Sequence, residues 1–249
     1  MDALRSQASL ARFLAPEAAP GRRLLLPSEE AHHLRHVLRL RPGQEILLLD
    51  TQGKEYWAEV ERFERDQVWV KTKGLRREEP RPLKELILGL PLLKRDLLSF
   101  LVEKAVELGL SRVILVKTSR TPPKKEQKLR SKLERRALQA LKQCRRLWRL
   151  NIEGPVPLEE LADLSVHKKI VAYEYEKARF SPSLFKIEPH QRLLLLSGPE
   201  GGFSLKEISF LQAKGFESVS LGRYILRAET AAFYLMCVAH SQNLMDLAN

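Results

Sequence analysis

The chain has 249 residues, 44% of them hydrophobic and 30% charged, a composition typical of a globular protein and not of a disordered or fibrous one. Its formal net charge of +12 indicates a polyanionic partner. The sequence shows no signal peptide and no apolar run of membrane length, and Cys144 and Cys237 stand far apart, so we expect a soluble cytoplasmic protein without a membrane partner.

Residues 1–75 predict a small, mostly β unit. A helix is expected from Ser28, as its N-cap, to Leu40, where the following Arg-Pro-Gly sequence ends it. Strands are expected at residues 45–49, 55–62 and 67–72, and short strands at this spacing favour a compact barrel. Residues 76–82 combine charges and prolines with no apolar anchor, which predicts a linker to a second domain.

From residue 83 onward, strands and helices alternate, which predicts an α/β domain with a mainly parallel sheet. The strands are expected at residues 86–90, 113–116, 169–173, 192–196 and 219–221. The helices are expected at residues 96–108, 128–148, 204–215 and 228–247. Ser204 and Glu207 predict a capping box at the start of the third of these helices.

Positive charge is concentrated between residues 120 and 149, where 12 lysines and arginines stand against 2 glutamates. A charge run is often only the solvated face of a helix, but this surplus exceeds what solubility requires, so we expect contacts with RNA phosphates. The residues expected to make them are Arg120, Arg145 and Arg146 here, and Arg35, Arg39 and Arg41 in the first unit.

Two loops lie where ligands bind in parallel sheets, next to the ends of predicted strands. Residues 197–203 read Ser-Gly-Pro-Glu-Gly-Gly-Phe, and glycines at this density permit a tight turn and close approach of a ligand to the backbone. Residues 221–227 read Leu-Gly-Arg-Tyr-Ile-Leu-Arg and precede the last helix. Neither loop has the glycine spacing of a dinucleotide or P-loop site, and on spacing alone a plain strand-to-helix turn is the simpler explanation.

Taken together, the two loops resemble the signature of the RsmE-type methyltransferases, which belong to the SPOUT class. The resemblance rests on residues 198–204, Gly-Pro-Glu-Gly-Gly-Phe-Ser, and residues 221–231, Leu-Gly-Arg-Tyr-Ile-Leu-Arg-Ala-Glu-Thr-Ala. Residues 104–109, Lys-Ala-Val-Glu-Leu-Gly, and residues 36–39, His-Val-Leu-Arg, are similar to further stretches of that family. The similarity extends over essentially the whole chain.

This resemblance implies a PUA-like RNA-binding β-barrel over residues 1–75 and a trefoil-knotted SPOUT methyltransferase domain over residues 83–249. It implies S-adenosylmethionine as cofactor, N3 of a uridine in 16S ribosomal RNA of the small subunit as methyl acceptor, and a homodimer. The expected cofactor-binding residues are Leu196, Ser197, Gly198, Glu200, Gly201, Gly202, Leu221, Gly222, Ile225, Leu226 and Thr230.

Removal of the uridine N3 proton needs a carboxylate base, or a cation that stabilises the resulting anion. Our hypotheses for these roles are Glu200, Arg227 and Glu229. Each also has a structural explanation, since Glu229 suits a helix start, Arg227 can pair with it, and Glu200 can shape its turn. No metal site is expected, because His32 and His36 have zinc-like spacing but no third ligand nearby.

The chain departs from the family pattern at Lys142, where the family tends to have glutamate, so two alternatives stay open. One is a SPOUT methyltransferase that acts on another RNA or another base atom. The other is a catalytically inactive RNA-binding factor of ribosome assembly, against which the intact glycine-rich loops argue.

Overall fold

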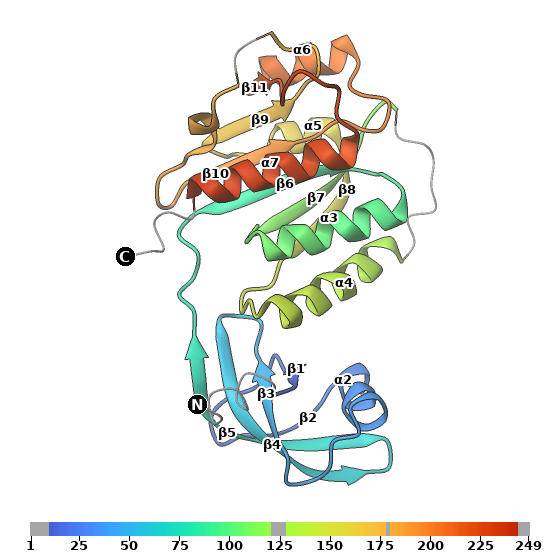
Figure 1. The fold of residues 1–249 in the computed structure, drawn as a ribbon, viewed down its shortest axis with the longest axis vertical. Coiled ribbons are helices and arrows are strands. Elements are labelled where there is room, and N and C mark those ends of the chain that lie inside the picture. Colours follow the sequence, from blue (N-terminus) through green and yellow to red (C-terminus); the bar gives the residue numbers. More distant parts are fainter. Residues whose placement is uncertain (1–9, 121–127, 178–179, 244–249) are drawn as a thin grey trace. The chain divides into compact units, whose positions relative to one another are not determined.

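The structure is a computed structural model, and it describes residues 10–120, 128–177 and 180–243 (Figure 1). The chain divides into two compact units. The first consists of Met1–Arg81 together with Leu141–Arg149, and the second of Pro82–Ala140 together with Leu150–Asn249. In the described ranges, no helix combines the length and the hydropathy needed to cross a membrane.

The first unit contains a five-stranded sheet in the order β1-β3-β4-β5-β2. Its strands are β1 (Arg12–Leu14), β2 (Arg23–Leu25), β3 (Glu45–Leu49), β4 (Lys54–Glu64) and β5 (Gln67–Glu78). Strand β1 runs parallel to β3, and the other neighbours are antiparallel. The prediction for β3 is confirmed at both ends, whereas β5 continues beyond its expected end. Glu78 pairs with Lys54 across the β4–β5 hairpin, so the expectation that the linker begins at residue 76 is wrong.

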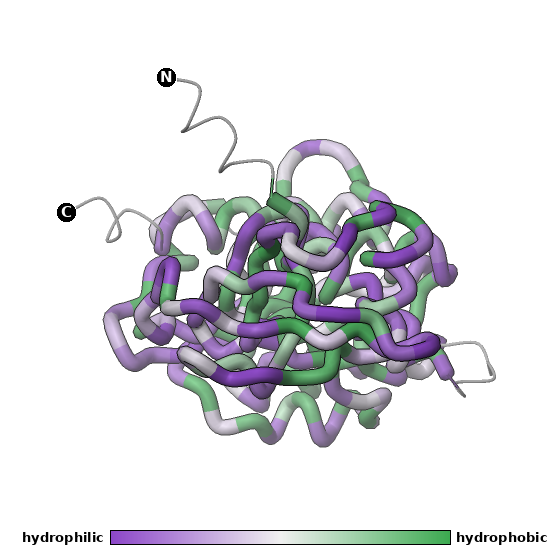
Figure 2. Tube along the Cα trace, turned by 90° about the horizontal axis from the view of Figure 1, so that it is seen from below, coloured by the Kyte–Doolittle hydropathy of each residue, from purple (hydrophilic) through white to green (hydrophobic). Residues whose placement is uncertain are grey.

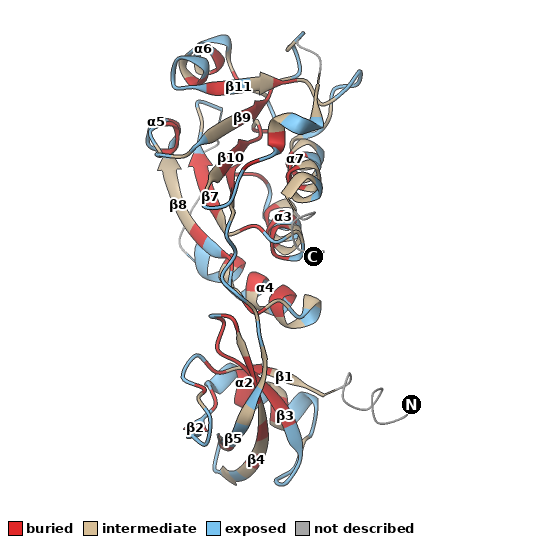
Figure 3. Ribbon diagram, turned by 90° about the vertical axis from the view of Figure 1, so that its left-hand side faces the viewer, coloured by how far each residue is buried: buried red, intermediate tan, exposed pale blue. Residues whose placement is uncertain are grey.

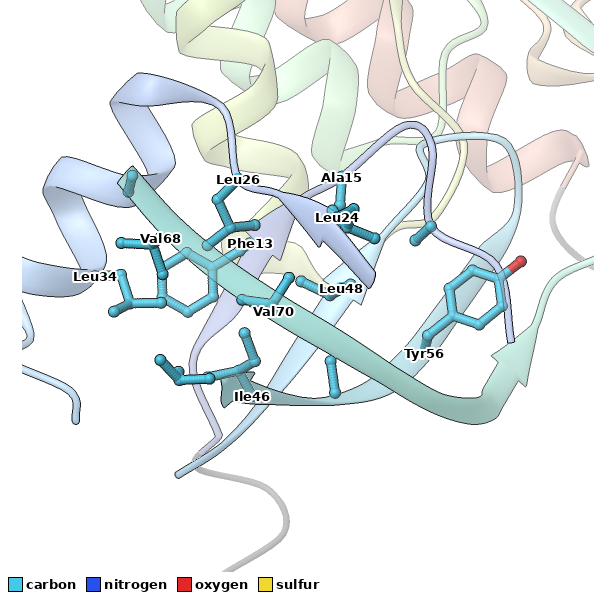
Figure 4. Close-up of a cluster of buried hydrophobic side chains, with 14 residues drawn as sticks. Phe13, Ala15, Leu24, Leu26, Leu34, Ile46, Leu48, Tyr56, Val68 and Val70 are labelled. Carbon is cyan, nitrogen blue, oxygen red and sulfur yellow. The ribbon is translucent and has the colours of Figure 1, made fainter. Parts of the chain in front are cut away.

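The core of this unit follows the two-residue period of its strands (Figure 4). Alternate residues of β3, such as Ile46 and Leu48, meet Val68 and Val70 of β5 and Phe13 of β1. These five side chains have no exposed surface. The inward set is apolar and the alternate positions of β5 are mostly polar or charged, which fixes the register of the hairpin.

The predicted helix of the first unit forms, but it is shorter than expected. Helix α2 (Ser28–His32) continues as a π-helical segment, η1 (His33–Val37). The left-handed backbone of Arg39 then turns the chain away, before Leu40 is reached. The expectation that Ser28 is the N-cap is also wrong, because Pro27 occupies that position and no side chain caps this helix.

The second unit contains a six-stranded sheet in the order β11-β9-β10-β6-β7-β8, and all its paired neighbours are parallel. Its strands are β6 (Glu85–Pro91), β7 (Arg112–Lys117), β8 (Asn151–Pro157), β9 (Lys168–Ala172), β10 (Arg192–Leu196) and β11 (Phe216–Val219). The α/β prediction with a parallel sheet is confirmed. Strand β8 was not expected, because Gly154 and Pro155 interrupt its pattern, and it is tolerated at the edge of the sheet.

Helices cover both faces of this sheet (Figures 1 and 3). Helices α3 (Arg95–Glu107) and α7 (Ala228–Asn243) lie on one face, and α5 (Leu158–Ala162) and α6 (Leu205–Ala213) on the other. The central strands are therefore buried on both sides, which is why β10 reads as an almost continuous run of leucines. Along the trace, short hydrophobic and hydrophilic stretches alternate (Figure 2).

Two further segments are helical. Helix α4 (Leu129–Cys144) ends earlier than the expected residue 148, because Arg145 adopts a left-handed backbone with φ 63°. The 3₁₀ helix η2 (Pro182–Phe185) precedes β10. The expected end of the last helix at Leu247 lies outside the described residues, and the trefoil knot stays a prediction.

Candidate functional site

A pocket opens where three neighbouring strands of the second unit end. Strands β9, β10 and β11 are adjacent in the sheet, so the loops at their carboxyl ends meet at one edge. The pocket has a volume of about 290 Å³, close to the lower end of the range of small-molecule sites. It is lined by Ala172, Tyr173, Glu174, Tyr175, Gly198, Pro199, Glu200, Gly201, Gly202, Ser220, Leu221, Gly222, Arg223, Tyr224, Ile225, Leu226, Arg227, Ala228 and Ala231.

The loop after β10, residues 197–203, is shaped by a glycine turn. The backbone N–H of Gly202 donates to the carbonyl oxygen of Pro199 at 2.9 Å. Gly202 has φ 69°, and a Cβ atom there would lie 2.8 Å from Oε1 of Glu174. Glycine is favoured at this position, because another residue would strain the backbone and displace the Glu174 carboxylate.

A capping box closes the same loop and confirms the prediction made for Ser204 and Glu207. The Glu207 N–H donates to Ser204 Oγ at 3.2 Å, and the Ser204 N–H donates to Glu207 Oε2 at 2.8 Å. The other carboxylate oxygen accepts the N–H of Ser119 at 2.9 Å. Burial acts to raise the pKa of the Glu207 carboxyl, but these hydrogen bonds outweigh it and lower the pKa below its usual value.

The loop after β11 presents apolar and basic groups to the pocket. Tyr224 is 78% exposed and Ile225 is 75% exposed, although both line the pocket. The Arg223 guanidinium lies 5.9 Å from the centre of the Tyr224 ring. Arg227 stands directly before α7, and its carbonyl oxygen accepts the Ala231 N–H at 2.9 Å. The start of α7 therefore holds Arg227 at the edge of the pocket.

Most of the expected cofactor-binding residues are brought together in this pocket. Gly198, Glu200, Gly201, Gly202, Leu221, Gly222, Ile225 and Leu226 all line it. Leu196 and Ser197 are instead fully buried and outside the lining, and Thr230 is exposed on α7 and also outside it. Of the residues proposed for proton removal or charge stabilisation, Glu200 and Arg227 line the pocket and Glu229 does not.

The sequence reasoning missed the contribution of β9. Tyr173, Glu174 and Tyr175 follow the carboxyl end of this strand and line the pocket. This loop also follows the carboxyl end of a parallel strand, where ligands bind, but it contains no glycine and so carried no signal in the sequence. Glu174 is the most informative of the three, because its carboxylate lies against the Gly202 turn.

The groups in the pocket fit S-adenosylmethionine. The carboxylates of Glu174 and Glu200 are complementary to its sulfonium and ammonium charges, and the guanidinium group of Arg223 to its carboxylate. Apolar side chains of the β11 loop suit an adenine ring. Because Gly202 has no Cβ atom, its backbone lies close against the Glu174 carboxylate.

The arginines expected to contact RNA differ in their surroundings. In the first unit, Arg39 and Arg41 are exposed, and Arg35 lies over the Phe63 ring with its guanidinium carbon 5.4 Å from the ring centre. Arg35 also donates to the carbonyl oxygen of Arg65. Contact of these three arginines with RNA phosphates stays a prediction.

The three basic residues from the segment 120–149 are less uniform. Arg145 is exposed, and its carbonyl oxygen accepts a hydrogen bond from Arg77 Nη2 at 2.6 Å. Burial lowers the pKa of Arg146, which is only partly exposed. Arg120 is exposed, yet Nη1 of its guanidinium donates to the carbonyl oxygen of Gly201 in the glycine turn.

Comparison with known protein families gives two matches. Residues 79–240 match an RNA methyltransferase domain, and residues 26–73 match an RNA methyltransferase PUA domain. Ribosomal RNA small subunit methyltransferase E of Aquifex aeolicus is 30% identical over 225 residues, which cover 89% of this chain and 96% of that protein.

Two solved structures are similar over nearly the whole chain. A Legionella pneumophila protein with SAM bound is 26% identical, with a TM-score of 0.84, and the match covers 93% of this chain and 97% of that one. Ribosomal RNA small subunit methyltransferase E of Neisseria gonorrhoeae, bound to S-adenosylmethionine, is 25% identical, with a TM-score of 0.79 and the same coverage.

Proposed function

Because the chain belongs to the family of RNA methyltransferases that includes ribosomal RNA small subunit methyltransferase E, we propose that it transfers a methyl group from S-adenosylmethionine to ribosomal RNA of the small subunit. The acceptor that its sequence signature implies is N3 of a uridine in 16S ribosomal RNA. One observation supports this most strongly: both signature loops line the same pocket, at the carboxyl ends of adjacent parallel strands.

S-adenosylmethionine supplies an electrophilic methyl group, and its carbon–sulfur bond breaks as the new nitrogen–carbon bond forms. The chain's main contribution is to position the reactants. Leu221, Ile225 and Leu226 would hold the adenine, and the backbone of the glycine turn would surround the ribose and methionine ends. The carboxylate of Glu174 would face the cationic part of the cofactor.

Methylation at N3 also requires that the N3 proton leave before or during attack. We assign its removal to Glu200 or Glu229. The negative charge that then spreads onto the neighbouring uridine carbonyl oxygens would be stabilised by Arg227. Glu200 and Arg227 line the same pocket, which supports their assignment over that of Glu229.

The remaining parts of the proposal concern partners. The first unit would form the PUA-like RNA-binding domain and the second unit the knotted SPOUT methyltransferase domain, acting as a homodimer in the cytoplasm. Arg35, Arg39, Arg41 and Arg145 would meet RNA phosphates, in keeping with the net charge of +12. Their contribution would weaken steeply as salt concentration rises.

The first test is titration of the full chain with S-adenosylmethionine by calorimetry. Saturable binding is expected, and Gly201→Trp should abolish it by filling the turn. Gly74→Trp is the matched control, because a Cβ atom at Gly74 would meet nothing within 4 Å. Absence of binding by the unaltered chain would refute the enzymatic proposal and leave an RNA-binding assembly factor.

The acceptor is tested separately, by mass analysis of nucleosides from ribosomal RNA of a deletion strain before and after treatment with the purified chain. Appearance of 3-methyluridine at one position in 16S RNA would support the proposal. A methyl group on another base atom or another RNA would support the alternative SPOUT activity and refute the uridine assignment.

A further inference from the structure

The segment that follows β7 reaches the glycine turn of the pocket, although β7 and β10 are not neighbours in the sheet. Strand β6 lies between them. Two residues just beyond the end of β7 nevertheless contact the β10 loop and the helix after it. The Ser119 N–H donates to Glu207 Oε1 at 2.9 Å, and the Arg120 guanidinium donates to the Gly201 carbonyl oxygen.

The Arg120 side chain lies along the turn as well as bonding to it. A Cβ atom at Gly201 would lie 3.1 Å from Arg120 Cδ and 3.7 Å from Nη1. The carbonyl of Gly201 belongs to the peptide group whose N–H is that of Gly202, and this N–H donates to Pro199. A guanidinium held on that carbonyl therefore fixes the orientation of the peptide group that closes the turn.

Part of this turn lies at the surface. Glu200 and Gly201 are exposed, and glycine backbone is the most costly to order when a ligand binds. A contact that orders the loop before the ligand arrives reduces that cost and so raises affinity. The Ser119 bond to Glu207 holds the other end of the same loop, at the start of α6.

We propose that Arg120 is a positioning residue of the cofactor site, whose guanidinium holds the Gly201 carbonyl and preorders the glycine turn for the cofactor. This assignment replaces the RNA-phosphate contact expected from the sequence, and it rests on the proposed function. The side chain touches the loop and not the reacting atoms, so its effect falls on cofactor binding and leaves the methyl transfer step unchanged.

The test compares three variants of the full chain. Arg120→Ala removes the contact, Arg120→Lys keeps a cation that can reach one acceptor, and Lys206→Ala removes an equal charge from an exposed residue at the start of α6. For Arg120→Ala we expect the S-adenosylmethionine Kd and KM to rise about fivefold to tenfold, as for loss of one exposed charge-assisted hydrogen bond. We expect kcat to stay unchanged, Arg120→Lys to recover part of the affinity, and Lys206→Ala to match the unaltered chain.

RNA binding separates this role from a phosphate contact. If Arg120→Ala leaves the cofactor Kd unchanged but weakens RNA binding and lowers its salt slope by about one, the arginine is a phosphate contact and the proposal is wrong. The proposal would also be wrong if Arg120→Ala lowered Tm and changed kcat, the KM for S-adenosylmethionine and the KM for RNA together, and if Arg120→Lys recovered none of these losses.

A readout that needs no cofactor keeps this test independent of the proposed function. In the free protein, amide hydrogen exchange of Gly202 and Phe203 should be several-fold faster in Arg120→Ala than in Lys206→Ala. Unchanged exchange would refute the positioning role. Failure of the unaltered chain to bind S-adenosylmethionine would refute the proposed function alone and leave the exchange result to decide this one.

Discussion

Replacement of Gly202 by alanine should weaken cofactor binding in the pocket, in addition to a modest loss of unfolding free energy. Gly202 has φ 69°, and an added Cβ would lie 2.8 Å from Glu174 Oε1. Gly215 offers a matched comparison in the same unit, because it has φ 85° but a Cβ there would meet nothing within 4 Å. Both substitutions impose left-handed backbone on alanine, but only the first introduces a clash inside the pocket.

The magnitudes follow from these two geometries. Left-handed backbone costs alanine about 1–2 kcal/mol, so each variant should lose about that much unfolding free energy. For a chain of this size, each kcal/mol lowers Tm by about 2–4 °C. In Gly202→Ala the Glu174 carboxylate must also move away from its place against the turn. We expect this movement to weaken S-adenosylmethionine binding about tenfold or more, which corresponds to about 1.4 kcal/mol.

Differential scanning calorimetry measures the fall in Tm, and isothermal titration calorimetry with S-adenosylmethionine measures the change in cofactor Kd. Gly215→Ala should lower Tm and leave the cofactor Kd unchanged. The reasoning fails if the two variants bind the cofactor equally well, because the contact between Gly202 and Glu174 would then have no part in shaping the site.

Three further predictions concern other contacts. Arg227→Ala should lower kcat about 100-fold while calorimetry shows little change in cofactor Kd, and a normal kcat would exclude Arg227 from charge stabilisation. Lys142→Met should lower the free energy of unfolding of the first unit by about 1–3 kcal/mol, measured by chemical denaturation, because the buried Glu30 carboxylate loses the ammonium group 2.7 Å away. Adding Glu30→Gln to the same chain should recover part of this loss, because it removes the unpaired charge. Folding lowers the pKa of Glu207 from 4.5, so the ionised carboxylate stabilises the folded protein above that pH. This contribution to stability is lost as the pH falls through the pKa that Glu207 has in the folded protein. The Tm of Glu207→Gln should therefore fall less below pH 4.5 than the Tm of the unaltered chain.

Much of the second unit could be predicted from the sequence, because its local patterns and its tertiary structure agree. Strand β10 is apolar throughout and has the expected bounds, since both its faces are covered. The capping box at Ser204 depends only on residues three apart, and it forms as expected. Gly109 ends α3 with φ 74°, as a glycine in that position predicts.

The errors arose where distant residues decide the outcome. The last strand was expected at residues 219–221, but β11 is Phe216–Val219, because its pairing with β9 sets its place in the sheet. The role of Glu174 depends on a glycine that lies far along the chain, and no local pattern reports it. Arg120 belongs to a basic segment that predicts contacts with RNA, yet its guanidinium donates to the Gly201 carbonyl oxygen. The two residues are 81 positions apart, so no local sequence pattern predicts this contact.

The contact of Lys142 with Glu30 has a consequence for the order in which the protein is made. Leu141–Arg149 belongs to the first unit, where Trp148 Nε1 donates to the Glu79 carbonyl oxygen at 3.1 Å and Lys142 neutralises a buried carboxylate. Domains generally fold as they leave the ribosome, the N-terminal one first. This chain has to depart from that order, because its N-terminal unit lacks its last segment until much of the following unit has been translated. Nascent chains that end near Arg81 should therefore remain sensitive to protease, and protection should begin only once residue 149 has emerged.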